Sequence, residues 1–371
     1  MYISGLSITN YKNYHQHVYE LHPKINLIVG LNGVGKTNLL DAVYYSCIGK
    51  SYSTNSDRYN IRKGEDFFRL EGIFYNNEDE KNRVEIKVER DKKKAISLDG
   101  KKYKRISEHV GNYPSVMISP TDVQGLLDAS EERRKFIDQS IIQYDRLYLN
   151  HLLAYNKLLK QRNTLLKQFA EQRNYNDLLL NTLSEKMAEP AQKIYEARKS
   201  FVERISDQFT ATYSHISENK EQARIEYKSS LADTSFLESL TQSKERDRIL
   251  QRTTKGIHKD DLKLVMNDDQ LKVYASQGQL KSFIMALKLS QYKIIQSVHK
   301  NTPILLLDDI FDKLDQERVK FIIDILLKND YGQLFISDTN LYRVENILQI
   351  LETNYHKFVI ENTESISLEK H

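Results

Sequence analysis

The residues best suited to chemistry form a glycine-rich loop near the start of the chain. An apolar segment at 25–29 runs directly into Gly30, Leu31, Asn32, Gly33, Val34, Gly35, Lys36 and Thr37, which match the phosphate-binding pattern G-x-x-x-x-G-K-[ST]. The glycines let backbone N–H groups turn toward phosphates, the lysine reaches the β- and γ-phosphates, and the threonine hydroxyl ligates Mg²⁺. Because the loop separates a predicted strand from a predicted helix, the sequence predicts a nucleotide and Mg²⁺ site.

Two carboxylates near the other end of the chain are of the kind that complete such a site. Asp308 and Asp309 follow an apolar strand predicted at 304–307. A carboxylate in the first position can hold Mg²⁺ through water, and the next can orient or deprotonate an attacking water. Buried strands commonly stop at surface acids, so the phosphate loop upstream is what favours a function. We interpret Asp308 as a magnesium residue and Asp309 as the catalytic carboxylate.

A third element combines serine and glycine at the start of a predicted helix. It consists of Ser276, Gln277, Gly278 and Gln279, and apolar residues at helical spacing follow it. Free N–H groups and the positive end of the helix dipole make such a helix start a suitable anion site. Alone, the segment would indicate only a capped helix. Its position upstream of Asp308 favours a role at the nucleotide.

The elements that must position these residues divide the chain into three segments. Residues 1–121 and 256–371 show mixed strand and helix patterns. Residues 122–255 carry apolar side chains at helical spacing and no strand signal, which predicts antiparallel helices. A hairpin is expected where 267–270 separates two strand-like runs, 262–266 and 271–275.

Composition restricts the class of protein. The chain has 371 residues, 40% hydrophobic, with a net charge of +4 and a single cysteine, Cys47. These values predict a cytoplasmic globular protein of two or three domains without disulfides. No apolar run approaches the ~20 residues that span a bilayer, and the first residues lack the features of a signal peptide. The weak positive charge does not by itself indicate nucleic-acid binding.

Taken in order, these motifs resemble the RecF family of bacterial recombination mediators, a branch of the ABC-type ATPases related to chromosome-maintenance proteins. The segments that carry the resemblance are 8–14, 30–42, 131–138, 256–262, 275–282 and 307–315. The resemblance implies an α/β ABC-type ATPase head built from 1–121 and 256–371. It also implies that 122–255 forms an inserted α-helical arm domain of short antiparallel helices.

The resemblance implies an ATP-dependent homodimer. Each of two ATP molecules, with Mg²⁺, would be held by residues 30–37 of one subunit and capped by residues 276–279 of the other. Asp312 and Asp315 would lie in a loop that crosses this interface. The dimer would bind single-stranded or gapped DNA, help a RecR-like mediator to load a RecA-like recombinase, and support replication restart and the SOS response. We expect no membrane partner and a weak DNA-dependent ATPase activity.

Basic clusters are candidates for DNA contact because cations pair with phosphates without reading sequence. The residues concerned are Lys92, Lys93, Lys94, Lys102 and Arg105. A solvated hairpin surface is an equally good interpretation of the cluster at 92–94.

Several positions depart from the family pattern. Lys12 and Lys259 stand where arginine is usual, which keeps charge but loses bidentate contact. Ser53 stands in place of an arginine, and 119–122 lacks the expected magnesium-sensing glutamine. Asp309 replaces a glutamate, and because its side chain is shorter we expect slow hydrolysis.

Two alternatives remain within the ABC-type ATPases. A transporter subunit normally needs that glutamate and a switch histidine, where this chain has Ser337 and Asp338. A chromosome-structure protein needs far longer coiled-coil arms than 122–255 can form.

Overall fold

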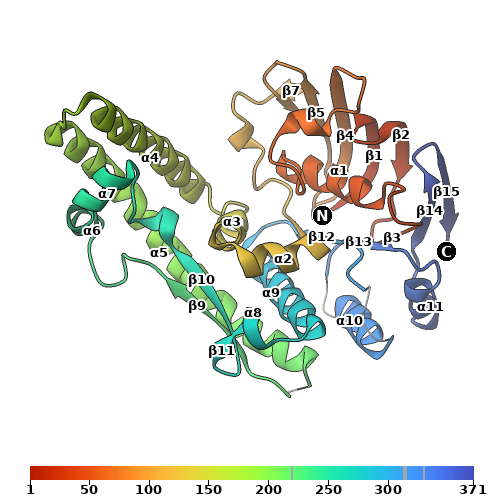
Figure 1. Ribbon diagram of the computed structural model, residues 1–371. Helices are drawn as coiled ribbons and strands as arrows, with labels where there is room; N and C mark the ends of the chain where they lie inside the picture. The colour runs from red at the N-terminus through yellow and green to blue at the C-terminus, as the bar shows by residue number, and fades with distance from the viewer. Residues whose placement is uncertain (219, 312–315, 329–330) are drawn as a thin grey trace. The chain divides into compact units, whose positions relative to one another are not determined.

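The computed structural model describes residues 1–218, 220–311, 316–328 and 331–371, and the chain divides into two compact units (Figure 1). The head comprises Met1–Val123 and Gln277–His371, and the arm comprises Gln124–Ser276. The head is therefore assembled from two segments that the arm separates in sequence. The segment 256–276, expected in the head, packs within the arm.

The first sheet of the head has six strands in the order β2-β1-β4-β5-β6-β7, all antiparallel. The strands are β1 (Tyr2–Tyr11), β2 (Tyr14–Glu20), β4 (Phe67–Tyr75), β5 (Lys81–Glu89), β6 (Ala95–Leu98) and β7 (Lys101–Lys102). In β4 and β5, buried residues alternate with more exposed ones. This alternation is expected of an antiparallel sheet that buries one face.

The second sheet of the head has the order β15-β14-β3-β13-β12-β8. Its strands are β3 (Ile25–Val29), β8 (Ser115–Ile118), β12 (Ile304–Leu307), β13 (Leu334–Asp338), β14 (His356–Asn362) and β15 (Ser365–Lys370). All neighbours pair in parallel except β14 and β15. Every residue of β3, β8, β12 and β13 is buried, as in parallel sheets covered on both faces. The carboxyl ends of β3 and β12, separated only by β13, therefore lie at one edge.

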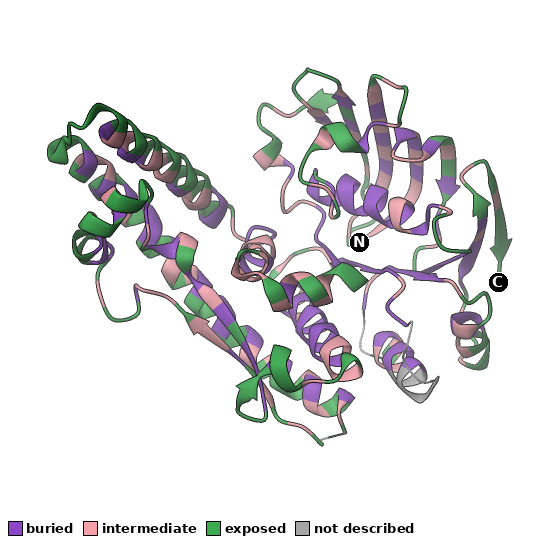
Figure 2. Cartoon of the chain, in the orientation of Figure 1, coloured by how far each residue is buried: buried purple, intermediate pink, exposed green. Residues whose placement is uncertain are grey.

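Helix α1 (Lys36–Ile48) joins the two sheets into a single core. It contacts β1, β4 and β5 of the first sheet and β8 and β13 of the second. Nearly all of its residues are buried (Figure 2), which is why the sequence here is apolar around most of the helix. The remaining head helices are η1 (Asp57–Asn60), η2 (Ile106–Glu108), α9 (Gln277–Val298), α10 (Gln316–Lys328) and α11 (Arg343–Ile350). Helix α2 (Pro120–Asp128) crosses the boundary between the units.

The arm is built on an antiparallel pair of long helices, α4 (Arg146–Gln172) and α5 (Asp177–Ile216). The side chains of Asp145 and Asn176 cap their first turns by accepting hydrogen bonds from Tyr148 N and Leu179 N. The other arm elements are α3 (Ser130–Ile141), β9 (Ala223–Lys228), α6 (Phe236–Gln242), α7 (Lys244–Leu250), η3 (Ile257–Lys259), β10 (Asp261–Met266), β11 (Asp269–Gln270) and α8 (Leu271–Tyr274).

Two expectations for the arm were wrong. The region without strand signals contains β9, which pairs with β10 along its whole length. The expected second strand at 271–275 is instead the short helix α8, and only Asp269–Gln270 pairs back onto β10. The pairing of β9 with β10 explains why 256–276 belongs to the arm. None of the helices in the described ranges is long and apolar enough to cross a membrane.

Candidate nucleotide site

The glycine-rich loop needs glycine because the chain passes very close to its neighbours. At Gly30, an added Cβ would lie 2.3 Å from the backbone oxygen of Ile360. At Gly35, where φ is 121°, an added Cβ would lie 3.0 Å from Asn13 Nδ2. Such positions accept glycine and strain other residues. The loop thus joins the buried end of β3 to the first turn of α1, as the motif requires.

Lys36 opens α1 with its side chain turned back over the loop. Its ammonium donates hydrogen bonds to the carbonyl oxygens of Gly30 at 2.9 Å and Leu31 at 3.2 Å. It lies 3.5 Å from Asp309 Oδ2, and its side chain is only 3% exposed. The ammonium therefore sits between the phosphate loop and the carboxylates after β12.

Thr37 and Asp308 meet although 271 residues separate them in sequence: Thr37 Oγ1 donates to Asp308 Oδ1 at 3.0 Å. Ser337, at the end of β13, donates to the same oxygen at 2.8 Å. Burial, reinforced by the nearby charge of Asp309, raises the pKa of Asp308 to about 6, although the hydrogen bonds from Ser337 and Thr37 oppose the shift. A buried carboxylate whose charge is only partly stabilised by hydrogen bonds is a suitable ligand for a cation.

Asp309 adopts a left-handed backbone conformation with φ of 44°. Such a conformation in a residue other than glycine costs on the order of 1–3 kcal/mol and is concentrated at functional sites. Its N–H donates to Ser337 Oγ at 2.9 Å. Within the described part of the chain, its Oδ1 is buried and has no hydrogen-bond partner. The turn therefore presents one carboxylate oxygen for further bonding.

Ser337 has no role predicted from the sequence, yet it contacts the carboxylate of Asp308 and the backbone of Asp309. It accepts from the backbone of Asp309 and donates to the side chain of Asp308. Ser337 lies near the end of a strand that pairs in parallel with β12, at the position where a transporter subunit has its switch histidine. Because the order of strands in a sheet cannot be read from one sequence, the sequence does not predict this contact.

Lys12 and Ser53, two of the positions that depart from the family pattern, are in contact, and Lys12 also pairs with Asp41, a buried carboxylate of α1. Lys12 Nζ lies 2.5 Å from Asp41 Oδ2 and donates to Ser53 Oγ at 2.7 Å. Asp41 also accepts from Tyr11 OH, Ser51 Oγ and Tyr52 N. Lys12 thus ties β1 and the loop after α1 to the helix that carries the phosphate loop.

A second buried cation occupies the region where the magnesium-sensing glutamine was expected. Lys288 of α9 lies 3.1 Å from Asp122 Oδ1 and donates to Tyr52 OH at 2.8 Å. The hydroxyl of Tyr52 in turn donates to Asp122. These side chains connect α9, the start of α2 and the loop after α1. No magnesium-sensing role is assigned to Asp122, because it is already paired with a cation.

The remaining predicted residues lie elsewhere. Ser276 immediately precedes α9, which begins at Gln277 and includes Gly278 and Gln279, and the boundary between the units falls between residues 276 and 277. Asp312 and Asp315 lie outside the described residues.

The predicted DNA-contact residues of the head differ in their surroundings. Lys94 is paired with Asp57 at 2.9 Å and its side chain is 11% exposed. Lys92 pairs with Glu89 at the surface. Lys93, Lys102 and Arg105 are exposed.

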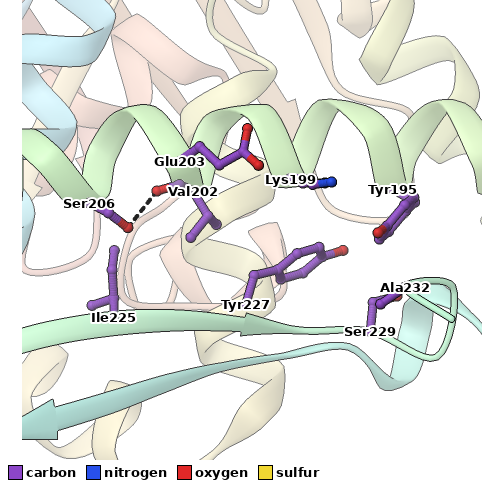
Figure 3. A pocket seen from close by; sticks show the side chains of 9 residues that line it. All are labelled: Tyr195, Lys199, Val202, Glu203, Ser206, Ile225, Tyr227, Ser229 and Ala232. Carbon is purple, nitrogen blue, oxygen red and sulfur yellow. Dashed lines mark hydrogen bonds between the residues drawn. The ribbon is translucent and has the colours of Figure 1, made fainter.

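The arm contains a separate hollow of about 360 Å³ between α5 and β9 (Figure 3). It is lined by Tyr195, Lys199, Val202, Glu203, Ser206, Ile225, Tyr227, Ser229 and Ala232. The Ser206 hydroxyl is occupied, because it donates to the Val202 carbonyl at 2.7 Å. The lining combines apolar side chains with one lysine and one glutamate at an exposed rim. None of the predicted site residues lies in it.

Comparison with known proteins places this geometry in a family. A family model described as the RecF/RecN/SMC N terminal domain matches residues 2–361. The chain is 40% identical over 365 residues to a DNA replication and repair protein RecF of Phocaeicola vulgatus, with 98% of each chain covered. It is 40% identical over 361 residues to the RecF protein of Bacteroides thetaiotaomicron, with 97% of each covered.

Solved structures agree with the sequence comparison. The structure of a recombination mediator protein RecF with ATP, in the RecFOR pathway, has a TM-score of 0.89 and 28% identity, covering 100% of this chain and 97% of that one. An Smc head bound to the C-winged helix domain of ScpA has a TM-score of 0.61 at 15% identity, which shows the fold alone. The predicted α/β ATPase head with an inserted helical arm is confirmed. The chain therefore belongs to the RecF/RecN/SMC family, and within it to the RecF proteins.

Proposed function

We propose that this chain is an ATP-gated DNA-binding protein that acts in recombinational repair and replication restart. The observation that carries the proposal is the 3.0 Å contact between Thr37 and Asp308, because it joins the two half-motifs of an ATPase site from opposite ends of the chain. Relatives named DNA replication and repair protein RecF, and a solved RecF with ATP, support the same function.

The residues present fit a magnesium–ATP complex. Thr37 Oγ1 and Asp308 Oδ1 converge on one point with oxygen atoms, the donors that Mg²⁺ prefers. Thr37 and Asp308 would hold Mg²⁺, which would supply positive charge to stabilise the negative charge that develops on the phosphate groups during transfer. Lys36 would exchange its bonds to the Gly30 and Leu31 carbonyls for bonds to phosphate oxygens. The unpaired Oδ1 of Asp309 would accept a hydrogen bond from the attacking water.

Hydrolysis should be slow, so that ATP works mainly as a switch. Asp309 is shorter than the glutamate usual in ABC-type sites, and its second oxygen, Oδ2, already faces Lys36 at 3.5 Å. Residues 276–279 of a second copy would cap the nucleotide, with Asp312 and Asp315 near the interface, so that ATP binding favours a homodimer. The dimer would bind single-stranded or gapped DNA, and would work with a RecR-like mediator and a RecA-like recombinase.

Light scattering of the purified chain tests the switch. The wild type should be dimeric with ATP and Mg²⁺ and monomeric with ADP. Lys36→Met should bind no ATP and remain monomeric, whereas Ser276→Arg should bind ATP normally and also remain monomeric. If the Ser276→Arg variant dimerised like the wild type, the capping role of residues 276–279 would be wrong. A wild type that is monomeric with every nucleotide would contradict the ATP-gated dimer itself.

A further inference from the structure

An exposed tyrosine lies on a basic surface of the head. Tyr59 belongs to η1, and 76% of its surface is accessible. A single exposed ring means little by itself, because isolated apolar groups are normal on protein surfaces. The cations that surround this ring give it a specific context. Arg58 precedes it in η1 and is itself exposed.

An ion pair holds η1 against the turn between β5 and β6. Lys94 Nζ lies 2.9 Å from Asp57 Oδ2 and donates to the Gly49 carbonyl at 2.7 Å. Tyr45 OH donates to the other oxygen of Asp57 at 2.6 Å. Since Lys93 precedes Lys94 in the chain, this contact brings Lys93 beside η1.

The segment after β7 also lies close to Gly49, the residue whose carbonyl oxygen binds Lys94. A Cβ built on Gly49 would lie 3.8 Å from Ile106 Cγ2, so the chain just before Ile106 passes close to the carbonyl that binds Lys94. That segment contributes Lys104 and Arg105, both exposed. Lys94 and Ile106 therefore lie beside Gly49, and Asp57 is paired with Lys94. The exposed residues next to these three in the chain are Arg58, Tyr59, Lys93, Lys104 and Arg105.

The cations of this surface keep their charge available. Among the described residues, Arg58, Lys93, Lys104 and Arg105 have no carboxylate within ion-pair distance. The neighbouring acids are occupied: Asp57 pairs with Lys94, and Glu89 pairs with Lys87 and Lys92. One exposed acid, Asp91, accompanies the cluster in sequence. The surface is thus positively charged and includes the exposed aromatic ring of Tyr59.

We propose that Tyr59 stacks on an unpaired base and that Arg58, Lys93, Lys104 and Arg105 bind the backbone of the same single strand. Cations attract any nucleic acid through its phosphates. A protein ring can stack only on a base whose face is free, which single strands offer and a continuous duplex does not. This inference rests on the proposed DNA-binding function and adds the residues of the head that would contact the single strand.

The stacking is tested by titrating the full chain, with ATP and Mg²⁺, against three labelled probes: oligo(dT), an abasic strand of the same length, and a duplex. Tyr59→Ala should weaken oligo(dT) binding by about tenfold, the effect of losing one stacked base, and leave the other two probes unchanged. Arg105→Ala should weaken both single-stranded probes alike, because both retain phosphates. Tyr342→Ala is the matched control, since this head tyrosine is 62% exposed and the lysine over its ring, Lys357, is paired with Glu345 and Glu369.

A fluorescence readout is available because the chain contains no tryptophan. In a Tyr59→Trp variant the indole would be the sole tryptophan, and oligo(dT) should quench it while the abasic strand should not. Tyr342→Trp should respond to neither probe. If Tyr59→Ala bound oligo(dT) as tightly as the wild type, the stacking role would be wrong while DNA binding stood. If the wild type bound none of the probes with ATP, the proposed function would fail, and this inference with it.

Discussion

The head and the arm both bury charged side chains, but they satisfy them differently. In the arm, Arg198 is almost fully buried and bonds to Asp138, Asp260, Tyr148 and a backbone carbonyl. In the head, Asp308 is equally buried, yet its pKa is raised to about 6 by burial. In the arm, buried charge holds elements together, whereas the buried carboxylate of Asp308 accepts hydrogen bonds from two hydroxyl groups and has no ion-pair partner among the described residues.

Arg162 shows the same saturation in the arm. Its guanidinium bonds to Asp247 Oδ2 at 2.8 Å, Thr253 Oγ1 at 2.7 Å and Ser184 Oγ at 3.2 Å. It therefore joins α4, α5 and α7 through a buried polar contact. In the head, Asp309 keeps one buried oxygen without a partner among the described residues, and so does Asp260 in the arm. The two regions differ instead in ion pairing: Asp260 is paired with Arg198 at 3.0 Å, whereas Asp308 meets two hydroxyl groups and no ion-pair partner among the described residues.

The largest expected effect comes from breaking the arm network. Arg198→Met would leave Asp138 and Asp260 without their cation, and removing one partner of a buried ion pair costs about 3–5 kcal/mol. Hydrogen exchange in urea, followed for peptides of α5, measures this loss in the arm itself. ATP binding by the head should persist.

Arg246→Met is the matched control, because Arg246 is an exposed arm arginine. An exposed substitution of this kind should change stability by no more than about 0.5 kcal/mol. If Arg198→Met cost less than about 1 kcal/mol, the arm would not depend on its buried charges as described.

In the head, removing a buried charge is expected to increase folding stability rather than to reduce it. At neutral pH the charged form of Asp308 opposes folding, because its pKa in the folded chain is above the unfolded value. Asp308→Asn should therefore stabilise the nucleotide-free head by about 3 kcal/mol at pH 7.5, while weakening magnesium–ATP binding by roughly 100-fold. Urea denaturation and nucleotide titration measure the two effects.

The pH dependence of this variant provides the check. The cost of charging Asp308 is complete above its folded pKa of about 6 and disappears as the pH falls toward 3.8, the ordinary pKa of an aspartate. The stability advantage of Asp308→Asn should thus shrink as the pH falls from 7 toward 4. A variant less stable than the wild type at pH 7.5 would contradict the account of an uncompensated carboxylate.

A smaller effect, loss of folding stability at acidic pH, should be shared by both regions. Burial lowers the pKa of His109 in the head and of His258 in the arm to about 4. Because the unfolded histidines bind protons near pH 6.5, stability is present above that pH and is lost as the pH falls toward 4. Each should cost about 1 kcal/mol between pH 7.5 and 5.5. His109→Gln should flatten the acid dependence of head peptides in hydrogen exchange and leave that of arm peptides unchanged; equal acid dependence with and without the substitution would rule out this origin.

Local patterns identified the phosphate loop and Asp308, which the structure brings into contact, whereas contacts between residues distant in sequence could not be predicted. The phosphate loop follows from a contiguous motif, and a strand ending in two carboxylates suggested the role of Asp308. Arg162 interrupts an apolar stripe, and its burial depends on Asp247, a partner far along the chain. Strand β9 has only a short alternation of its own, and its pairing with β10 decides its structure. Periodicity reports which face is buried but not which residue lies opposite.

The most direct test of the account is a DNA-binding titration of the wild type with ATP, with ADP and without nucleotide, at two salt concentrations. The account predicts tight binding with ATP, weaker binding in the other two states, and a steep loss of affinity with salt because phosphate contacts release counterions. DNA affinity that did not change with the nucleotide would contradict the ATP-gated function.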